Sequence, residues 1–571
     1  MTAEKQTAEG GAVRSRDYGY QKNFRTALPQ IIAVSVKNLL LLGYGMTLGF
    51  PTILIPAVRE PAEEEMKLEQ SEISWIGSIN LIVVPLGCAM SGVVTTPLGR
   101  RRAMQLVNVP FFVAWLILHF ATSSAHLYAA LSLTGLAGGL LEAPVLTYVA
   151  EVTQPHLRGS LTATSSMCII LGVFTQFLFG LLLPWRSVAL LNISFTILAV
   201  VALCFIPESP HWLVSRKRHE EARKSLQWLR GWTGAKAVED ELRDIQALFK
   251  KGNGISENEE ETLAEKLSHY KERSFLLPFG LVCYAFFVGH FSGMTTLQTY
   301  AVSIFQMLQA PLDKYYATLV LGVLQLAGAG GCVLLVARAG KRPLALASTA
   351  GAALCCALLA GYDAYVRFYG LPKDEEIEKV TANTTAAPAQ AAVADNPYSW
   401  IPTSLLMLLA FITHTGIRLL PWILIGEVFS ANTRSGAAGL ASAVGYIFGF
   451  LTNKMYLSMV SSLAIWGTYG FYAIVCFTGC IAFYFILPET EGKQLIDIEN
   501  HFAGIKRLDN KVYRSKKRRV DVARLRDLKG VTNTTFEGDN PHEGRVSFID
   551  ITRFELNADE RPSQRQSRTY C

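Results

Sequence analysis

Two stretches of this chain follow the same pattern. One is Glu151-Val152-Thr153-Gln154-Pro155-His156-Leu157-Arg158-Gly159, and the other is Glu427-Val428-Phe429-Ser430-Ala431-Asn432-Thr433-Arg434-Ser435-Gly436. In each, a glutamate ends a long apolar segment and an arginine follows seven residues later. A signature written twice predicts two copies of one ancestral unit. Because both copies stand where an apolar run gives way to polar residues, we interpret the unit as a bundle of membrane helices, and two such bundles favour alternating access over chemistry.

The composition is typical of a membrane protein. Half of the 571 residues are hydrophobic and 17% are charged, whereas about 25% are charged in soluble domains. A spanning helix needs about 20 apolar residues, and twelve segments meet this requirement. They lie at about 29–57, 75–97, 103–122, 126–150, 160–183, 186–206, 275–307, 314–337, 343–366, 400–429, 437–460 and 466–487. We therefore predict an all-α membrane protein with twelve transmembrane helices in two pseudo-symmetric six-helix bundles.

The polar breaks between these spans divide the chain into five segments. They are a cytoplasmic N-terminal tail (1–28), an N-terminal six-helix bundle (29–206), an intracellular helical linker (207–274), a C-terminal six-helix bundle (275–488) and a cytoplasmic C-terminal tail (489–571). In the linker, Ala222, Leu226 and Leu229 fall on one stripe of a helix that ends before Gly231. This spacing predicts a short amphipathic helix under the bundle.

Charged residues alternate between the two sets of loops. Arg100-Arg101-Arg102 stands in one set, and Glu63-Glu64-Glu65 stands in the other. The positive-inside rule puts the basic loops and both termini in the cytoplasm. It also explains the net charge of +7 without a nucleic-acid partner. Asn383 begins a glycosylation sequon in a loop that this topology places outside, and we expect a multi-pass protein of the plasma membrane.

The repeat extends to other charged motifs. Gly99-Arg100-Arg101 recurs as Gly340-Lys341-Arg342, and Pro207-Glu208-Ser209 recurs as Pro488-Glu489-Thr490. Because acids and bases at the same inner ends can pair, we predict a network that closes the cytoplasmic face and breaks when that face opens. Its members are Arg100, Arg101, Glu151, Arg158, Glu208, Lys341, Arg342, Glu427, Arg434 and Glu489. The alternative is that the basic residues only determine topology.

Six motifs occur in order between about residues 30 and 502. They are Leu98-Gly99-Arg100-Arg101, Tyr148-Val149-Ala150-Glu151, Pro207-Glu208-Ser209-Pro210, Arg338-Ala339-Gly340-Lys341-Arg342, Pro421-Trp422 with Glu427, and Pro488-Glu489-Thr490-Glu491-Gly492-Lys493. The series resembles the sugar porter family of the major facilitator superfamily, and most closely its insect facilitated trehalose transporter-like branch. This resemblance implies the major facilitator fold, and facilitated or proton-linked movement of a sugar through a central site between the halves.

The resemblance also indicates where a sugar would bind, although several positions differ from the family pattern. The seventh span has Gly289-His290-Phe291-Ser292-Gly293-Met294-Thr295 where the family has Gln-Gln-x-Ser-Gly-x-Asn. A sugar site needs amide and hydroxyl partners for the sugar hydroxyls and an aromatic face for the ring. The candidates are Ser166, His290, Thr295, Gln298, Gln325, His414, Trp422 and Tyr446. For each of them the alternative is an interhelical hydrogen bond or packing.

Two charged residues fall inside predicted spans. Glu142 lies nine residues before Glu151, and Arg418 lies nine residues before Glu427, which is about 13 Å along a helix and near mid-membrane. A charge at that depth costs about 3 kcal/mol, and such residues usually face a cavity or a partner. Three alternatives follow. Glu142 and Arg418 approach one another across the cavity, or Arg418 binds an anionic or polyhydroxyl substrate while Glu142 titrates, or each is neutralised within its own bundle.

These features favour a carrier that moves a sugar of the trehalose or hexose class by alternating access. No Asp or Glu occurs from Pro29 to Val58, where proton-coupled relatives carry a carboxylate, so we expect facilitated uniport. The alternatives are a carrier of another small polar or anionic solute and a non-transporting nutrient sensor. The chain has no phosphate loop, metal-ligand cluster or nucleophile motif, which argues against an enzyme and against a cofactor. The expected partners are the solute and the lipid bilayer.

Overall fold

The structure is a computed structural model, and it describes residues 24–59, 68–256, 269–369, 398–429, 433–493, 495–505 and 508. These residues form helices joined by short turns, with no strand among them. Eleven of the helices are long and apolar enough to cross a membrane. The sequon at Asn383 lies outside the described residues.

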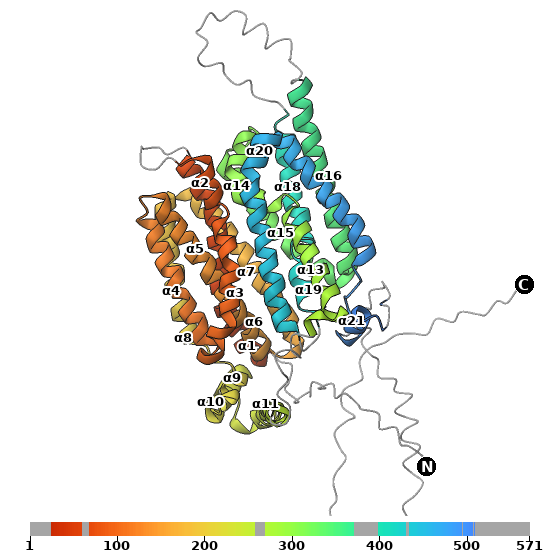
Figure 1. The fold of residues 1–571 in the computed structure, drawn as a ribbon. Coiled ribbons are helices and arrows are strands. Elements are labelled where there is room, and N and C mark those ends of the chain that lie inside the picture. The colour runs from red at the N-terminus through yellow and green to blue at the C-terminus, as the bar shows by residue number, and fades with distance from the viewer. Residues whose placement is uncertain are drawn as a thin grey trace, which may run out of the picture. The chain divides into compact units, whose positions relative to one another are not determined.

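The first half packs its helices in close pairs. Its helices are α1 (Phe24–Arg59), α2 (Gln70–Ile76), α3 (Ile79–Leu98), α4 (Arg100–His119), α5 (Ser124–Leu140), α6 (Glu142–Val152), α7 (Pro155–Leu182) and α8 (Trp185–Cys204), coloured red to light orange in Figure 1. A Cβ atom on Gly45 of α1 would lie 2.0 Å from the carbonyl oxygen of Ile169 in α7. A Cβ atom on Gly172 of α7 would likewise lie 2.1 Å from the carbonyl oxygen of Leu42. The two backbones are therefore in contact, as small residues permit between membrane helices.

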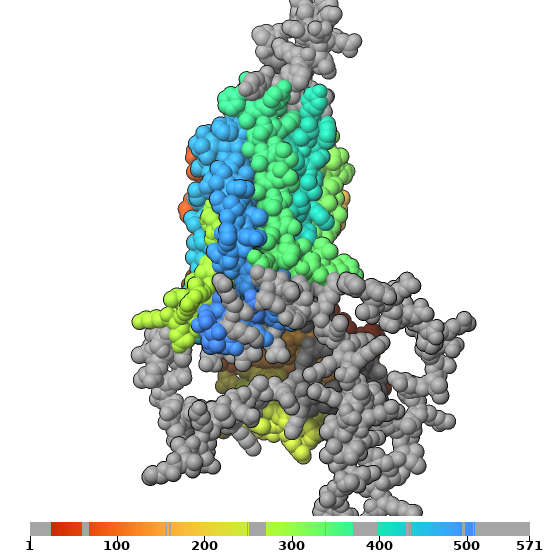
Figure 2. Space-filling model, turned by 90° about the vertical axis from the view of Figure 1, so that its right-hand side faces the viewer, coloured from red at the N-terminus to blue at the C-terminus, as the bar shows by residue number. Residues whose placement is uncertain are grey.

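The second half follows the same order. Its helices are α13 (Arg273–His290), α14 (Met294–Met307), α15 (Lys314–Ala339), α16 (Lys341–Tyr369), α18 (Trp400–Thr415), α19 (Leu420–Ile425), α20 (Arg434–Ile486) and α21 (Leu495–Phe502), and a 3-10 turn, η1 (His269–Lys271), precedes them. Helix α20 has 53 residues, or about 80 Å if straight, which is more than twice the bilayer core of about 30 Å. Its backbone breaks at Ala464, where φ is 56° and ψ is −174°. Helix α20 thus contains the last two of the twelve predicted spans, and its second part lies beside α16 (Figure 2).

Two spans of the second half are interrupted in their middle. The seventh span stops at residues 291–293, between α13 and α14, and the tenth stops at residues 416–419, between α18 and α19. Gly293 permits the first of these turns, because its φ of 82° lies in the left-handed region. Irregular backbone at membrane depth is tolerated where protein covers it or where it lines a cavity. His290, Thr295 and Arg418 of the candidate site lie in or next to these two interruptions.

The described part of the linker between the halves contains three helices. They are α9 (Pro210–Ser215), α10 (His219–Leu229) and α11 (Ala235–Ser256), at the lower end of the view in Figure 1. Helix α10 confirms the predicted amphipathic segment, since Ala222, Leu226 and Leu229 are all buried. Burial also lowers the pKa of His211 in α9, and the nearby carboxylates of Glu151 and Glu241 partly oppose this shift.

Arg230 fastens the linker to the first half. Its Nε and Nη2 atoms donate to the Glu241 carboxylate at 3.0 and 2.6 Å, and its Nη1 donates to the carbonyl oxygen of Val152 at 3.1 Å. Arg230 is 3% exposed and Glu241 is 8% exposed, so this ion pair is buried. Removing one partner of a buried pair costs about 3–5 kcal/mol, because the other charge is left uncompensated.

We expect Arg230→Leu to loosen α11 locally. Amide hydrogen exchange in α11 is expected to accelerate by about 100-fold, the factor that corresponds to a loss of about 3 kcal/mol. The matched control is Arg243→Leu, a change within α11 itself. Arg243 lies 3.8 Å from Asp240, and both side chains are mostly exposed. Equal exchange rates in the two variants would contradict this role of Arg230.

Candidate functional site

Hydrogen bonds between the two halves gather at the end of the bundle away from the linker. Thr52 Oγ1 of α1 donates to the carbonyl oxygen of Gln298 at 2.7 Å. Asn453 Nδ2 of α20 donates to the carbonyl oxygen of Gly77 at 2.8 Å and to Thr299 Oγ1 at 3.0 Å. Two side chains of α2 also donate to the opposite half. Ser74 Oγ donates to the carbonyl oxygen of Lys454 at 2.9 Å, and Gln70 Nε2 donates to the carbonyl oxygen of Leu457 at 3.3 Å. The predicted topology makes this end the outer one.

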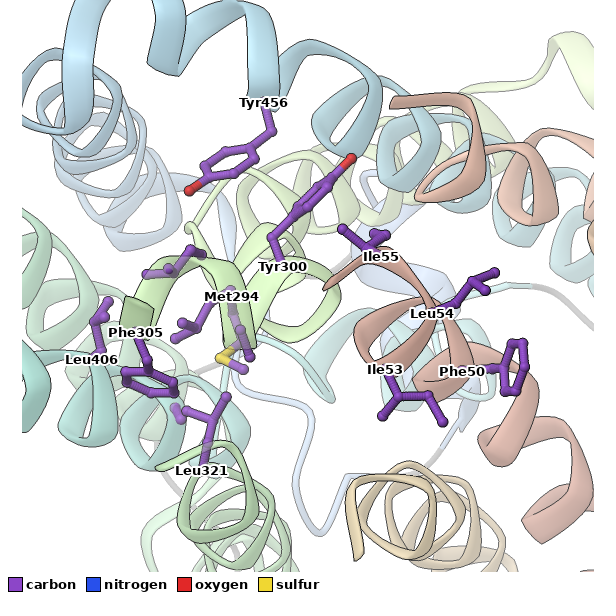
Figure 3. Packing of buried hydrophobic residues seen from close by; sticks show 14 of the residues in the cluster. Phe50, Ile53, Leu54, Ile55, Met294, Tyr300, Phe305, Leu321, Leu406 and Tyr456 are labelled. Atoms are coloured by element: carbon purple, nitrogen blue, oxygen red, sulfur yellow. The ribbon is translucent and has the colours of Figure 1, made fainter. Parts of the chain in front are cut away.

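Apolar side chains pack beside these hydrogen bonds. In Figure 3, Leu54 and Ile55 of α1 lie on one side of Tyr300, a residue of α14. The ring of Tyr300 stacks on that of Tyr456 from α20, with the centroids 4.9 Å apart. All four side chains belong to one buried cluster that includes residues from both halves. The outer ends of the halves are therefore closed together in this conformation.

Arg418 lies in the interruption of the tenth span and reaches the interruption of the seventh. Its Nη1 donates to Thr295 Oγ1 at 2.8 Å and lies 3.3 Å from His290 Nδ1. His290 ends α13 and Thr295 begins α14, and their side chains are 3.1 Å apart. A guanidinium only donates, so His290 Nδ1 acts as an acceptor and the neutral imidazole carries its proton on Nε2. Three residues predicted for the site thus meet at one point.

Aromatic side chains adjoin this point. The ring of Trp422 in α19 contacts that of Phe286 edge to face, with the ring centroids 5.0 Å apart. Its centroid lies 5.7 Å from that of Tyr446 in α20. The ring of Phe286 in turn stacks on that of His290, with the ring centroids 6.3 Å apart. Although Trp422 lies within the tenth span, 36% of its surface is exposed. A partly exposed aromatic side chain near hydrogen-bonding groups suits a ring that carries hydroxyls.

Glu142 lies at the boundary between the halves. Ser442 Oγ of α20 approaches Glu142 Oε1 to 3.5 Å, and Tyr44 and Tyr446 are near enough to interact with it electrostatically. In the described part of the chain, Glu142 forms no ion pair. The structure therefore does not bring Glu142 and Arg418 together, because Arg418 is bound by neutral groups of its own half.

The remaining predicted residues are more dispersed. Gln325 of α15 is 1% exposed, and neither its amide nitrogen nor its amide oxygen has a hydrogen-bond partner among the described residues. His414 Nδ1 lies 2.9 Å from the carbonyl oxygen of Ala410 and donates to it. Gln298 is held at the outer contact, and Ser166 is half-buried in α7. Of these four, Gln325 alone leaves a buried amide available to a ligand or a water, because such groups are nearly always hydrogen-bonded.

A further charged residue inside a span was missed by the sequence analysis. Lys37 of α1 is fully buried, and its Nζ donates to Ser165 Oγ at 2.6 Å. The adjacent Asn38 Nδ2 donates to Thr164 Oγ1 at 2.8 Å. The signal was visible, because Lys37 is the one charged residue between Pro29 and Val58, but the prediction for this span considered acids alone.

At the inner end of the first half, two glutamates bind the start of α4. Arg100 donates from Nε and Nη2 to the Glu151 carboxylate at 3.0 and 2.8 Å. Glu208 accepts the backbone N–H groups of Arg100 and Arg101 at 2.9 and 3.0 Å. Ser209 also hydrogen-bonds Glu151. A carboxylate at a helix N-terminus satisfies free N–H groups and interacts favourably with the helix dipole.

The second half repeats this arrangement at the start of α16. Lys341 Nζ donates to the two oxygens of Glu427 at 2.6 and 2.7 Å, and it also pairs with Glu491 at 2.9 Å. Glu489 accepts the backbone N–H groups of Lys341 and Arg342, each at 3.1 Å. The two networks are therefore equivalent by position, with lysine in place of arginine at the centre of the second.

Both inner networks close on their own half. Among the described residues, Arg158 donates to the carbonyl oxygen of Thr153 at 3.4 Å. Arg434 begins α20, and its side chain is outside the described set. Within the part of the chain that the structure describes, none of the predicted network residues forms a hydrogen bond or ion pair with the opposite half. The network as predicted would close the cytoplasmic face, but in this conformation it braces helix starts, and the halves are joined at the outer end instead.

Comparison with known proteins agrees with this architecture. The family described as sugar (and other) transporter matches residues 31–502. The facilitated trehalose transporter Tret1 of Apis mellifera ligustica is 28% identical over 480 residues, which cover 83% of this chain and 87% of that protein. Its namesake from Polypedilum vanderplanki is 26% identical over 504 residues, which cover 88% of this chain and 93% of that protein.

A solved structure shares the fold. The proton:xylose symporter XylE bound to 6-bromo-6-deoxy-D-glucose superposes with a TM-score of 0.62 at 18% identity, covering 84% of this chain and all of that one. The all-helical major facilitator fold predicted from the sequence is thereby confirmed, and the protein is a multi-pass membrane protein. Because the family match extends over most of its length, this chain belongs to the sugar (and other) transporter family.

Proposed function

We propose that this protein carries a sugar of the trehalose or hexose class across the membrane by alternating access. The observation that carries the proposal is that Trp422, 36% exposed within its span, contacts Phe286, which stacks on His290 next to Thr295. These groups lie at the interruptions of two spans, where transporters bind their substrates. The relatives named as trehalose transporters favour trehalose within this class.

The two bundles, residues 29–206 and 275–488, would move as bodies around this site. The outer contacts through Thr52 and Asn453 would break when the outer face opens. The inner networks around Arg100 and Lys341 would stay intact within each half and keep the helix ends together. Contact between the inner ends would then arise from surfaces that are apart in this conformation.

Transport would be uniport across the plasma membrane, with both termini in the cytoplasm. The first span contains no carboxylate between Pro29 and Val58 that could carry a proton. The basic inner loops support the orientation by the positive-inside rule. This orientation places Asn383 outside, where the sequon could be glycosylated.

Uptake into liposomes that contain the purified full-length protein tests the proposal. We expect saturable uptake of labelled trehalose or glucose, and a KM raised about tenfold in Trp422→Ala, because losing one aromatic face removes about 1.4 kcal/mol. The control is Trp400→Ala in the same span, since the Trp400 side chain is 56% exposed at the outer end of α18. Absence of sugar flux would refute the proposal, and sugar binding without flux would favour a nutrient sensor.

A further inference from the structure

Arg418 carries a charge that the described residues do not neutralise. Its side-chain contacts are Thr295 Oγ1 and His290 Nδ1, both neutral. Among the described carboxylates, none forms an ion pair with it, and Glu142, the acid at the equivalent position of the first half, approaches Ser442 instead. An unpaired cation at this depth of a membrane protein marks a functional site by default.

The guanidinium of Arg418 makes its hydrogen bonds through one of its own nitrogen atoms, and its Nε–Nη2 edge makes none to the described residues. Both neutral contacts are made by Nη1, while Nε and Nη2 have no partner among the described residues. The two atoms are not among the fully buried polar atoms that lack a partner, and the Arg418 side chain is half-buried. The Nε–Nη2 edge is the part of arginine that binds a carboxylate through two parallel hydrogen bonds.

Arg418 is connected to the aromatic part of the site through His290. His290, which fixes Nη1, stacks on Phe286, and Phe286 contacts Trp422. A ligand that lies against Trp422 can therefore direct an anionic substituent at Arg418. Neutral hydroxyls would also hydrogen-bond to arginine, but they would leave its charge uncompensated in a site of low dielectric.

We propose that this site also takes a sugar acid, a polyhydroxyl ring or chain that bears a carboxylate, and binds it more tightly than the matched neutral sugar. The carboxylate binds the Nε–Nη2 edge of Arg418, and the hydroxylated skeleton lies against Trp422. This assignment rests on the proposed function, because it specifies which sugars the carrier selects. Arg418 is then the residue that determines specificity, and Thr295 and His290 are positioning residues that orient its guanidinium.

Binding and uptake of two matched sugars test the assignment with the full-length protein. D-Glucuronate and D-glucuronamide have nearly the same shape and differ in the charge on C6. Calorimetry in detergent and uptake into liposomes are expected to favour D-glucuronate by at least about tenfold, the effect of one charge-assisted bidentate contact. This comparison needs no variant, so it holds even if substitutions at Arg418 impair folding.

Substitution then locates the preference. Arg418→Leu is expected to abolish the preference, because the affinity for D-glucuronate falls while the affinity for D-glucuronamide changes less than about threefold. Arg418→Lys is expected to retain part of the preference, because lysine keeps the positive charge but lacks the planar guanidinium. Arg338→Leu, a change of an exposed arginine, is the control and is expected to retain the preference in full.

The possible failures are distinguishable. Equal binding of the two sugars, or a preference that survives Arg418→Leu, would overturn the assignment and leave neutral sugar transport standing. Uptake of non-sugar carboxylates such as lactate without uptake of any sugar would overturn both the assignment and the proposed function. Failure of both sugars to bind the folded wild-type protein would also overturn the assignment.

Discussion

Gly45→Ala is expected to prevent stable association of α1 with α7. The added Cβ atom would lie 2.0 Å from the carbonyl oxygen of Ile169 and 3.0 Å from the Cα atom of Gly172. Both neighbours are backbone atoms, so no side chain can rotate away and the two helices must separate. Overpacking on this scale costs about 3 kcal/mol or more, and we expect a lower midpoint of thermal unfolding in detergent and a smaller yield of monodisperse protein.

Gly43→Ala is the matched control for this prediction. Gly43 lies two residues earlier in the same helix, and a Cβ atom placed there meets nothing within 4 Å. Alanine has a higher helix propensity than glycine by about 1 kcal/mol, so this variant is expected to be at least as stable as the wild type. The close contact of α1 with α7 would be disproved if both variants unfolded at the same temperature.

Lys341→Met is expected to destabilise the inner end of the second half. Lys341 is 5% exposed and its Nζ lies between the carboxylates of Glu427 and Glu491. Methionine would leave two neighbouring acids without their shared cation, and breaking a buried pair in this way costs about 3–5 kcal/mol. Thermal unfolding in detergent is therefore expected to show a lower midpoint for this variant.

Two further variants distinguish loss of the ion pair from a general effect. Lys341→Arg is expected to remain stable, because Arg100 occupies the equivalent position of the first half and pairs with Glu151 there. Arg338→Met removes an exposed cation at the end of α15 and is expected to have little effect. A midpoint for Lys341→Met that matches that of Arg338→Met would show that the network does not contribute to stability.

The fold was predictable because hydropathy and repeated charges are properties of the chain itself. The twelve spans follow from apolar length, and the pairing of Arg100 with Glu151 follows from the order in which acids and bases recur. The interruptions of the seventh and tenth spans were not predicted, since a turn inside an apolar run leaves the hydropathy unchanged. Gly293 and Gly416 at these turns are the local signals that could have indicated them.

The site was predictable as a set of residue types but not as a set of contacts. His290, Thr295 and Trp422 were candidates by chemistry, and the structure places His290 and Thr295 against Arg418 and connects Trp422 to His290 through Phe286. The contact of Arg418 with Thr295, and the separation of Glu142 from Arg418, depend on how helices rotate and where they break. Lys37 shows another limit, because a charge that finds neutral partners on the adjacent helix has no complementary residue to reveal it in the sequence.

The outer closure has a consequence for how such proteins diverge. Its acceptors are largely peptide oxygens, those of Gln298, Gly77, Lys454 and Leu457. Every amino acid supplies a peptide oxygen, so a substitution at an acceptor position preserves the hydrogen bond as long as the backbone of the helix stays in place. Selection would therefore act mainly on the donors, and homologues could replace much of this surface while retaining the same resting geometry.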